Sequence, residues 1–268
     1  MKIFDVHTHI YPDAIAERAV DALGKFYDFV CDGKGTYEDM TKSDVLNGVS
    51  GFLLLCVTTN AHQIRRANEF MVEAINRGRA EGFEAYAFGG IHPCGNMEEE
   101  IRFCMDNGLS GIKLHPDIQR VDIDDPRLYP LYETANGRFP VYFHMGDNRP
   151  EYRYSEPKKL AKILKDFPQL VVGGAHFGGY MAYDESVQYL CGNERVWFDT
   201  SSSLWAIPPE YTDELIKKLG SSRLMFGTDY PVKYPDSELL RFSRLTLTQK
   251  QREDILYTNA KTFLSLYN

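Results

Sequence analysis

The strongest constraint on the fold is a regular alternation of short apolar, β-rich runs with amphipathic stretches along all 268 residues. Short apolar runs bounded by turn signals predict buried strands, and apolar residues at helical spacing predict helices that cover them. Eight strands are predicted, at residues 2–6, 51–57, 84–91, 111–114, 140–144, 170–175, 196–199 and 224–228.

Helical stretches separate these strands. They lie at 14–26, 38–47, 61–79, 97–107, 127–136, 157–166, 183–190 and 210–219, and a C-terminal helical part spans 237–266 with a break near Leu247, where Thr248 is a plausible N-cap. Such alternation implies parallel strands with right-handed crossovers, and eight repeats favour a closed (β/α)8 TIM barrel over an open sheet. We therefore expect one barrel domain over residues 1–268. The segments 26–37 and 146–155 are the best candidates for loops that cover a substrate.

Composition narrows the class of protein. The chain has 43% hydrophobic and 25% charged residues, which is typical of globular domains, and its net charge of −8 argues against a nucleic-acid partner. The longest apolar run, 52–57, is too short to cross a membrane, and the first residues lack the pattern of a signal peptide. The five scattered cysteines predict free thiols in the cytoplasm, and a homodimer is the base-rate expectation for assembly.

Histidines gather where the predicted strands end. Six of the seven occupy such positions: His7, His9, His92, His115, His144 and His176. Asp229 follows the eighth strand, and Lys113 precedes His115 by two residues. The carboxyl ends of barrel strands form one rim, which holds the active site, so these side chains are expected to meet there.

Within this group, His7 and His9 are two residues apart on an extended segment and therefore face the same side. Imidazoles together with a carboxylate suit a divalent cation such as Zn²⁺ that keeps an open position for water. We predict that His7, His9, His144 and Asp229 form a metal site. The alternative is a hydrogen-bonded rim network without metal.

The motifs that carry these residues resemble those of the amidohydrolase superfamily, in particular its amidohydrolase-2 branch of TIM-barrel hydrolases and aminocarboxymuconate-semialdehyde-decarboxylase-like enzymes. They are DVHTH from residue 5, GIKLHP from 111, FHMG from 143, GAHFGG from 174 and GTDYP from 227, in family order.

The resemblance implies that His7, His9, His144 and Asp229 bind one divalent metal, Zn²⁺ or another such as Mn²⁺, rather than two. It implies that His176 either orients the attacking water or binds a second metal. Lys113 falls near the position of a carboxylated lysine that bridges two metals in some members. The other interpretation is a protonated lysine that contacts an anionic substrate.

Two reactions on a small-molecule substrate fit this group. The first is hydrolysis of an amide, ester or lactone by a metal-activated water, with Asp229 and His176 as catalytic residues. The alternative is non-oxidative decarboxylation of an aromatic or unsaturated acid. We rank hydrolysis first, because the chain is shorter than we expect for the decarboxylases. A barrel kept only as a binding scaffold is the third hypothesis.

Several residues near the rim are candidates for substrate contacts or for support of the site. Lys113, Arg149 and Arg153 are expected to bind a substrate carboxylate, with Arg120 as a further candidate. The aromatic wall would include Tyr152, Tyr154 and Trp205, whereas His92 and His115 would shape the rim. The loop that carries the two arginines could equally be an exposed segment that only grips its own rim.

Overall fold

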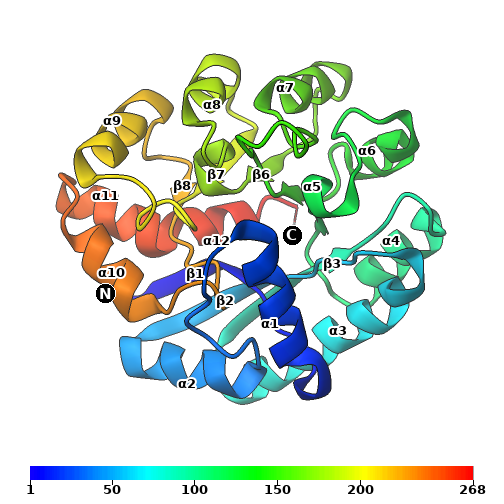
Figure 1. The fold of residues 1–268 in the computed structure, drawn as a ribbon, viewed down its shortest axis with the longest axis horizontal. Coiled ribbons are helices and arrows are strands. Elements are labelled where there is room, and N and C mark those ends of the chain that lie inside the picture. Colours follow the sequence, from blue (N-terminus) through cyan, green and yellow to red (C-terminus); the bar gives the residue numbers. More distant parts are fainter. Residues whose placement is uncertain (268) are drawn as a thin grey trace.

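The eight predicted strands pair in chain order into one parallel sheet that closes into a barrel, in a computed structural model that describes residues 1–267 (Figure 1). The strands are β1 (Ile3–Thr8), β2 (Val49–Leu55), β3 (Glu84–Gly90), β4 (Ile112–Leu114), β5 (Val141–Phe143), β6 (Val172–Gly174), β7 (Val196–Asp199) and β8 (Leu224–Met225). Backbone bonds close the barrel between the first and last strands, as from Val6 N to Phe226 O at 2.9 Å. The predicted (β/α)8 fold is thereby confirmed.

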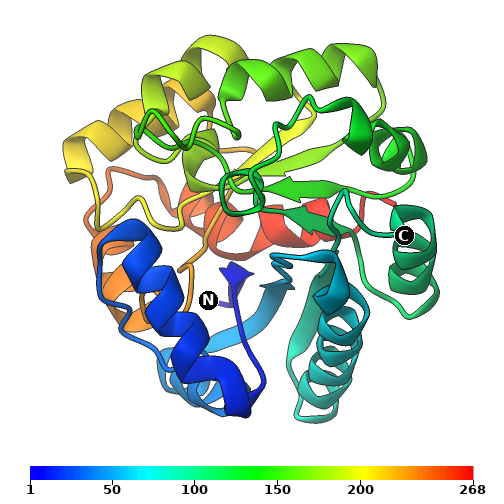
Figure 2. The same ribbon diagram turned by 45° about the vertical axis from the view of Figure 1, so that its right-hand side comes forward.

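The helices surround the barrel (Figures 1 and 2). They are α1 (Asp13–Tyr27), α2 (Tyr37–Asn47), α3 (Ile64–Ala80), α4 (Met97–Asp106), α5 (Pro116–Gln119), α6 (Tyr129–Ala135), α7 (Pro157–Asp166), α8 (Tyr183–Leu190), α9 (Pro209–Leu219), α10 (Pro235–Ser243), α11 (Gln249–Glu253) and α12 (Asn259–Leu264). Short 3₁₀ turns lie at Ala61–Gln63, Pro126–Leu128 and His176–Gly178, and a π-helical turn spans Asp254–Thr258.

The predicted break in the C-terminal helical part is present. Helix α10 ends at Ser243, and α11 begins after Thr248, whose side chain exchanges capping-box hydrogen bonds with Gln251. Helix α5 was not predicted, because four residues are too few to show a helical period. Strand β8 is shorter than the expected 224–228, yet the residues after it still hydrogen-bond to β1.

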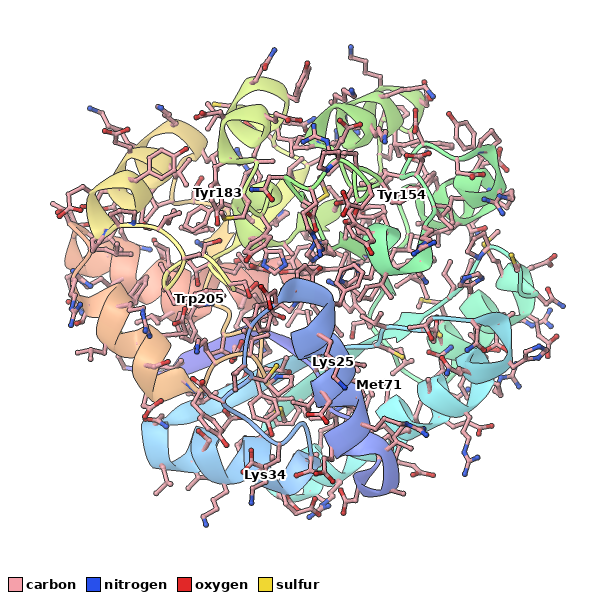
Figure 3. The ribbon with its side chains drawn as sticks, in the orientation of Figure 1. Lys25, Lys34, Met71, Tyr154, Tyr183 and Trp205 are labelled. Atoms are coloured by element: carbon pink, nitrogen blue, oxygen red, sulfur yellow. The ribbon has the colours of Figure 1, made fainter. Side chains whose placement is uncertain are left out.

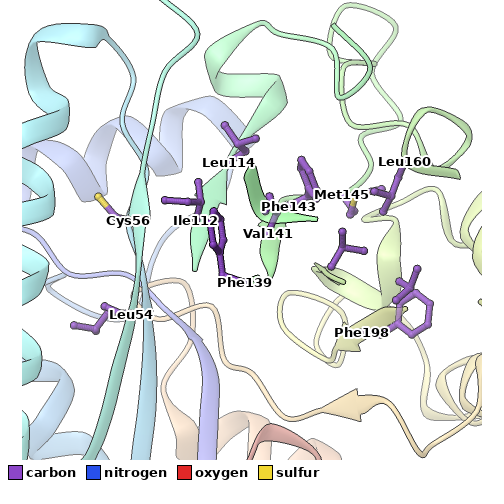
Figure 4. Close-up of a cluster of buried hydrophobic side chains, with 14 of the residues drawn as sticks. Leu54, Cys56, Ile112, Leu114, Phe139, Val141, Phe143, Met145, Leu160 and Phe198 are labelled. Atoms are coloured by element: carbon purple, nitrogen blue, oxygen red, sulfur yellow. The ribbon is translucent and has the colours of Figure 1, made fainter. Parts of the chain in front are cut away.

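Alternating strand residues divide the core into two clusters. On β4 and β5, Ile112, Leu114, Val141 and Phe143 point outward and pack under the helices (Figure 4). The inward-facing cluster contains Phe4, Val6, Leu53, Leu55, Phe88, Tyr142, Ala175, Trp197 and Met225, and it also includes Ala260, Phe263 and Leu264 of α12. Helix α12 therefore closes the barrel interior opposite the site, and helix α1 brings Tyr27 to the histidines that follow β4 and β5.

Candidate metal centre and pocket

A pocket with about 520 Å³ of empty space, part of it open to solvent, lies at the mouth formed by the carboxyl ends of the strands. Its wall contains His7, His9, Tyr11, Leu23, Tyr27, Phe29, Val57, His115, Ile118, His144, His176, Tyr180, Ser202, Asp229 and Val232. Five of the six histidines expected at the rim are in this set. His92 lies beyond it, where its Nδ1 accepts a hydrogen bond from Cys94 N at 3.3 Å.

Three predicted ligands converge at the centre of the pocket. The Nε2 atoms of His7 and His9 are 3.1 Å apart, and each lies 3.3 Å from Oδ1 of Asp229. These atoms form one of the groups in the described chain that could hold a metal ion.

The outer nitrogen of each ring indicates which atom carries the hydrogen. His7 Nδ1 lies 2.8 Å from Oδ2 of Asp199, and His9 Nδ1 lies 2.7 Å from the carbonyl oxygen of Leu55. Both partners accept, so both Nδ1 atoms are assigned as donors, which leaves the Nε2 lone pairs aimed at each other and at Asp229.

Three acceptors in mutual contact repel one another unless a cation lies among them. Burial, followed by the nearby charge of Lys113, lowers the pKa of His7 to about 4, so an extra proton on this ring is disfavoured. The distances of 3.1–3.3 Å between these atoms are close to the spacing of ~3.3 Å expected for tetrahedral ligands about 2.0–2.1 Å from a zinc ion. The donor set therefore fits a divalent metal.

The rings of His144 and His176 provide a second pair of lone pairs that face each other. His144 Nδ1 lies 3.0 Å from His176 Nε2. The opposite nitrogens face carbonyl oxygens, that of Gly146 at 3.1 Å from His144 and that of Ser201 at 2.9 Å from His176. By the same assignment, both facing nitrogens carry lone pairs. The structure does not bring His144, the fourth predicted ligand, into the group formed by His7, His9 and Asp229, but groups it with His115 and Asp117; His176 is grouped with His7 and Asp199.

Asp199 supports this arrangement and was not singled out from the sequence. Its Oδ2 accepts hydrogen bonds from His7 and, at 2.5 Å, from the Tyr142 hydroxyl, while its Oδ1 accepts from the backbone N–H groups of His176 and Ser201. Burial opposes its charge, yet His7 and these hydrogen bonds hold the pKa of Asp199 below its usual range. Its place at the end of the seventh strand was the signal that could have identified it.

The backbone is strained where the rim residues are held. His176, Ser202 and Asp229 have φ angles of 58°, 48° and 61°, in the left-handed region that costs non-glycine residues about 1–2 kcal/mol each. Ser202 Oγ donates to Oδ2 of Asp229 at 2.5 Å, which leaves Oδ1 facing the two histidines. Strain of this kind concentrates at functional sites.

Lys113 lies inside the barrel and does not line the pocket. Its Nζ has no hydrogen-bond partner among residues 1–267 and lies 5.1 Å from the ring centre of Tyr142. Burial lowers the pKa of Lys113 to about 8.

The arginines expected to bind substrate are paired with other protein groups. Arg149 donates to both carboxylate oxygens of Asp147, and Arg153 donates to the carboxylates of Glu156 and Glu185. Neither arginine lines the pocket, and Arg120 is exposed on the surface.

The remaining aromatic candidates also lie outside the pocket wall. Tyr152 packs against the ring of Phe26, and the backbone N–H of Tyr154 donates to Asp117. Trp205 contacts the ring of Phe29, which does line the pocket; Figure 3 shows the positions of Tyr154 and Trp205.

Comparison with known proteins identifies the family of the chain. The family model described as amidohydrolase, of the amidohydrolase-2 type, matches residues 4–266. The chain belongs to this family. A curated relative, the 2-amino-3-carboxymuconate-6-semialdehyde decarboxylase of Dictyostelium discoideum, is 26% identical over 212 residues. That match covers 63% of this chain and 57% of the relative.

Solved structures show the same fold. An uncharacterised TIM-barrel protein of Bordetella bronchiseptica has a TM-score of 0.81 and 22% identity, over 100% of this chain and 99% of that one. A dihydroxybenzoic acid decarboxylase of Polaromonas sp. JS666, which contains manganese and the inhibitor 2-nitroresorcinol, has a TM-score of 0.73 and 16% identity, over 100% and 98% of the two chains. In the part of this chain that the structure describes, no helix is long and apolar enough to span a bilayer.

Proposed function

We propose that this protein is a metal-dependent, non-oxidative decarboxylase of a small aromatic or unsaturated monocarboxylic acid. The observation that carries the proposal is the composition of the pocket wall. Within residues 1–267, that wall contains no lysine or arginine. Its apolar part consists of aliphatic side chains and the rings of Tyr11, Tyr27, Phe29 and Tyr180.

An apolar wall favours loss of carbon dioxide. A carboxylate that leaves water for this pocket loses favourable solvation. The departing carbon dioxide is neutral and loses little solvation, so the apolar wall destabilises the reactant more than the product. Because no cationic side chain lines the wall, the metal would hold the acid group, and one such centre suits one carboxylate.

Metal binding and proton exchange are both assigned to residues of the site. His7, His9, His144 and Asp229 would hold a divalent metal, which supplies positive charge to bind and polarise the acid. The bond between the ring or enol carbon and the carboxylate breaks, its electron pair stays on that carbon, and the carbon takes a proton. Asp229 is placed to exchange that proton, because its Oδ1 faces the pocket while Ser202 binds its other oxygen.

Named relatives support decarboxylation over the hydrolysis that the sequence ranked first. The Dictyostelium relative and the Polaromonas structure both carry decarboxylase names. Hydrolysis stays the second candidate, because Asp229 and His176 flank the same lone pairs and are placed to take a proton from water.

The test is release of carbon dioxide from the monocarboxylic acid 2,6-dihydroxybenzoate and, for comparison, from the dicarboxylic acids 5-carboxyvanillate and 2-amino-3-carboxymuconate-6-semialdehyde, by protein loaded with Zn²⁺ or Mn²⁺. Esters and lactones are assayed in parallel. We expect about one metal equivalent per chain and decarboxylation of a monocarboxylic acid. His9→Ala should lower that activity by about two orders of magnitude or more, since even the partners of ligands are worth 10- to 100-fold.

His62→Ala is the matched control, because His62 is the histidine away from the rim. Its activity should equal that of the unsubstituted protein. Turnover of esters or lactones without release of carbon dioxide from any of the acids would refute the proposal in favour of hydrolysis.

A further inference from the structure

Tyr27 lines the pocket, although it belongs to none of the sequence motifs that carry the rim residues. It is the last residue of α1, and its hydroxyl oxygen lies 3.0 Å from Nε2 of His115 and 3.1 Å from Nε2 of His144. Its ring forms part of the pocket wall.

Both neighbouring nitrogens are donors to this oxygen. His144 Nε2 also faces the carbonyl oxygen of Gly146, so it carries the hydrogen. His115 Nδ1 accepts from the backbone N–H of Ile118 at 3.4 Å, so its Nε2 carries the hydrogen as well. The Tyr27 oxygen therefore faces two N–H groups, and the one on His144 is shared with the carbonyl oxygen of Gly146.

The proton of the Tyr27 hydroxyl is then free for another acceptor. Neither nitrogen can accept it, and within residues 1–267 no carbonyl or carboxylate oxygen forms a hydrogen bond with this hydroxyl. The other nitrogen of His144, Nδ1, faces Nε2 of His176 on the pocket wall. One imidazole ring thus separates the Tyr27 hydroxyl from the ring of His176.

Arg149 holds this tyrosine in place. Its Nη1 donates to the carbonyl oxygen of Phe26 at 2.6 Å, and its guanidinium lies 4.7 Å from the ring of Phe26, 5.3 Å from that of Tyr27 and 4.3 Å from that of Tyr152. Asp147 fixes the guanidinium by three hydrogen bonds. The segments 26–37 and 146–155, which the sequence predicts as loops that cover a substrate, meet at this contact between Arg149 and Phe26.

We propose that the Tyr27 hydroxyl donates a hydrogen bond to an oxygen of the bound acid on the β4–β5 side of the pocket, and that Arg149 is the residue that positions it. This inference rests on the proposed function, since it needs an acid in the pocket. It also gives Arg149 a purpose other than the direct contact with substrate expected from the sequence.

The test measures affinity rather than turnover. Binding of 2,6-dihydroxybenzoate, 2-hydroxybenzoate and benzoate to the metal-loaded protein is followed by calorimetry, with metal content determined for every variant. Tyr27→Phe should weaken binding by about ten- to a hundredfold, because a hydrogen bond to a charged group is lost. Metal content should not change. Tyr129→Phe removes an exposed hydroxyl on α6 and should bind normally.

A double-mutant cycle tests the positioning role. Arg149→Lys keeps a charge near Asp147 but loses the planar stack and the bond to Phe26, so it should weaken binding less than Tyr27→Phe. The double variant should bind no more weakly than Tyr27→Phe alone, because Arg149 acts through Tyr27. Additive losses would overturn the role of Arg149.

The two proposals fail in different ways. Binding of an acid by the unsubstituted protein, with equal binding by Tyr27→Phe, would overturn the inference about Tyr27 and leave the proposed function intact. Absence of binding for all three acids by metal-loaded protein would also overturn the inference about Tyr27, whereas the proposed function is decided by the release of carbon dioxide.

Discussion

At the scale of single residues, Asp199 determines how the first metal-binding histidine is presented. It holds the Nδ1 hydrogen of His7, so the Nε2 lone pair faces His9 and Asp229. It also binds the backbone of His176 and Ser201, which links the ends of β6 and β7. One buried carboxylate thus orients the imidazole of His7 and anchors the backbone that carries His176.

Replacement of Asp199 by Asn should weaken metal binding by about 10- to 100-fold, because the amide lacks the charge and offers one acceptor oxygen where the carboxylate offers two. Competition with a chromogenic chelator measures the affinity. Asp236→Asn, at an exposed position on α10, is the control and should bind metal normally. An unchanged affinity in Asp199→Asn would show that Asp199 does not orient the ligand.

At the scale of elements, helix α10 carries a buried acid that its neighbours compensate only in part. Glu238 of α10 is completely buried; one oxygen accepts from Arg241 at 3.2 Å, and the other, Oε2, has no partner among residues 1–267. Burial raises the pKa of Glu238 to about 8, with Arg241 and Lys233 opposing the shift and Asp5 and Asp32 adding to it. The folded protein therefore holds this proton at neutral pH.

The free energy of unfolding should consequently decrease as pH rises from about 4.5 to about 8. The folded state binds the proton more tightly than the unfolded state, so stability is greatest below the ordinary pKa and falls until the folded pKa is passed. The contribution is on the order of 5 kcal/mol at most. Glu238→Gln should flatten this decrease in urea titrations across the range.

Glu210→Gln, an exposed glutamate on α9, should retain the slope of the unsubstituted protein. A Glu238→Gln profile as steep as that of the unsubstituted protein would assign the pH dependence to other groups.

At the scale of the whole molecule, the free energy of unfolding depends on helix α12, whose apolar side chains fill the end of the barrel opposite the site. Phe263 is completely buried, and its ring centre lies 6.1 Å from that of Phe88, 6.0 Å from Tyr142 and 5.6 Å from Trp197. These rings come from β3, β5 and β7, so one side chain of the last helix joins three strands that are far apart in the chain.

Phe263→Ala should lower the free energy of unfolding by about 3–5 kcal/mol, because it removes buried apolar contacts and leaves a cavity. Chemical denaturation measures the change. Leu266→Ala, three residues later and 40% exposed, should have a small effect. We expect the packing of α12 to be independent of the metal site, and loss of metal binding by a folded Phe263→Ala protein would contradict this.

The sequence by itself determined the barrel and the residues of its rim. Strand and helix periods are local, and parallel strands bring their carboxyl ends together whatever the loops do, so His7, His9, His144, His176 and Asp229 could be placed at one mouth. The branch of the family followed from the same motifs, and the family model confirms it.

Only the tertiary structure decided which side chains complete the site. Asp199 meets His7 across 192 residues, and Tyr27 meets His144 across 117, contacts that no local period encodes. The charge of Arg149 suggested a substrate carboxylate as its partner, but folding places Asp147 and the Phe26 carbonyl there first. Side chains on loops pair with residues that are distant in the sequence. These residues come within contact distance only when the strands assemble into the barrel, so the sequence alone does not reveal the pairs.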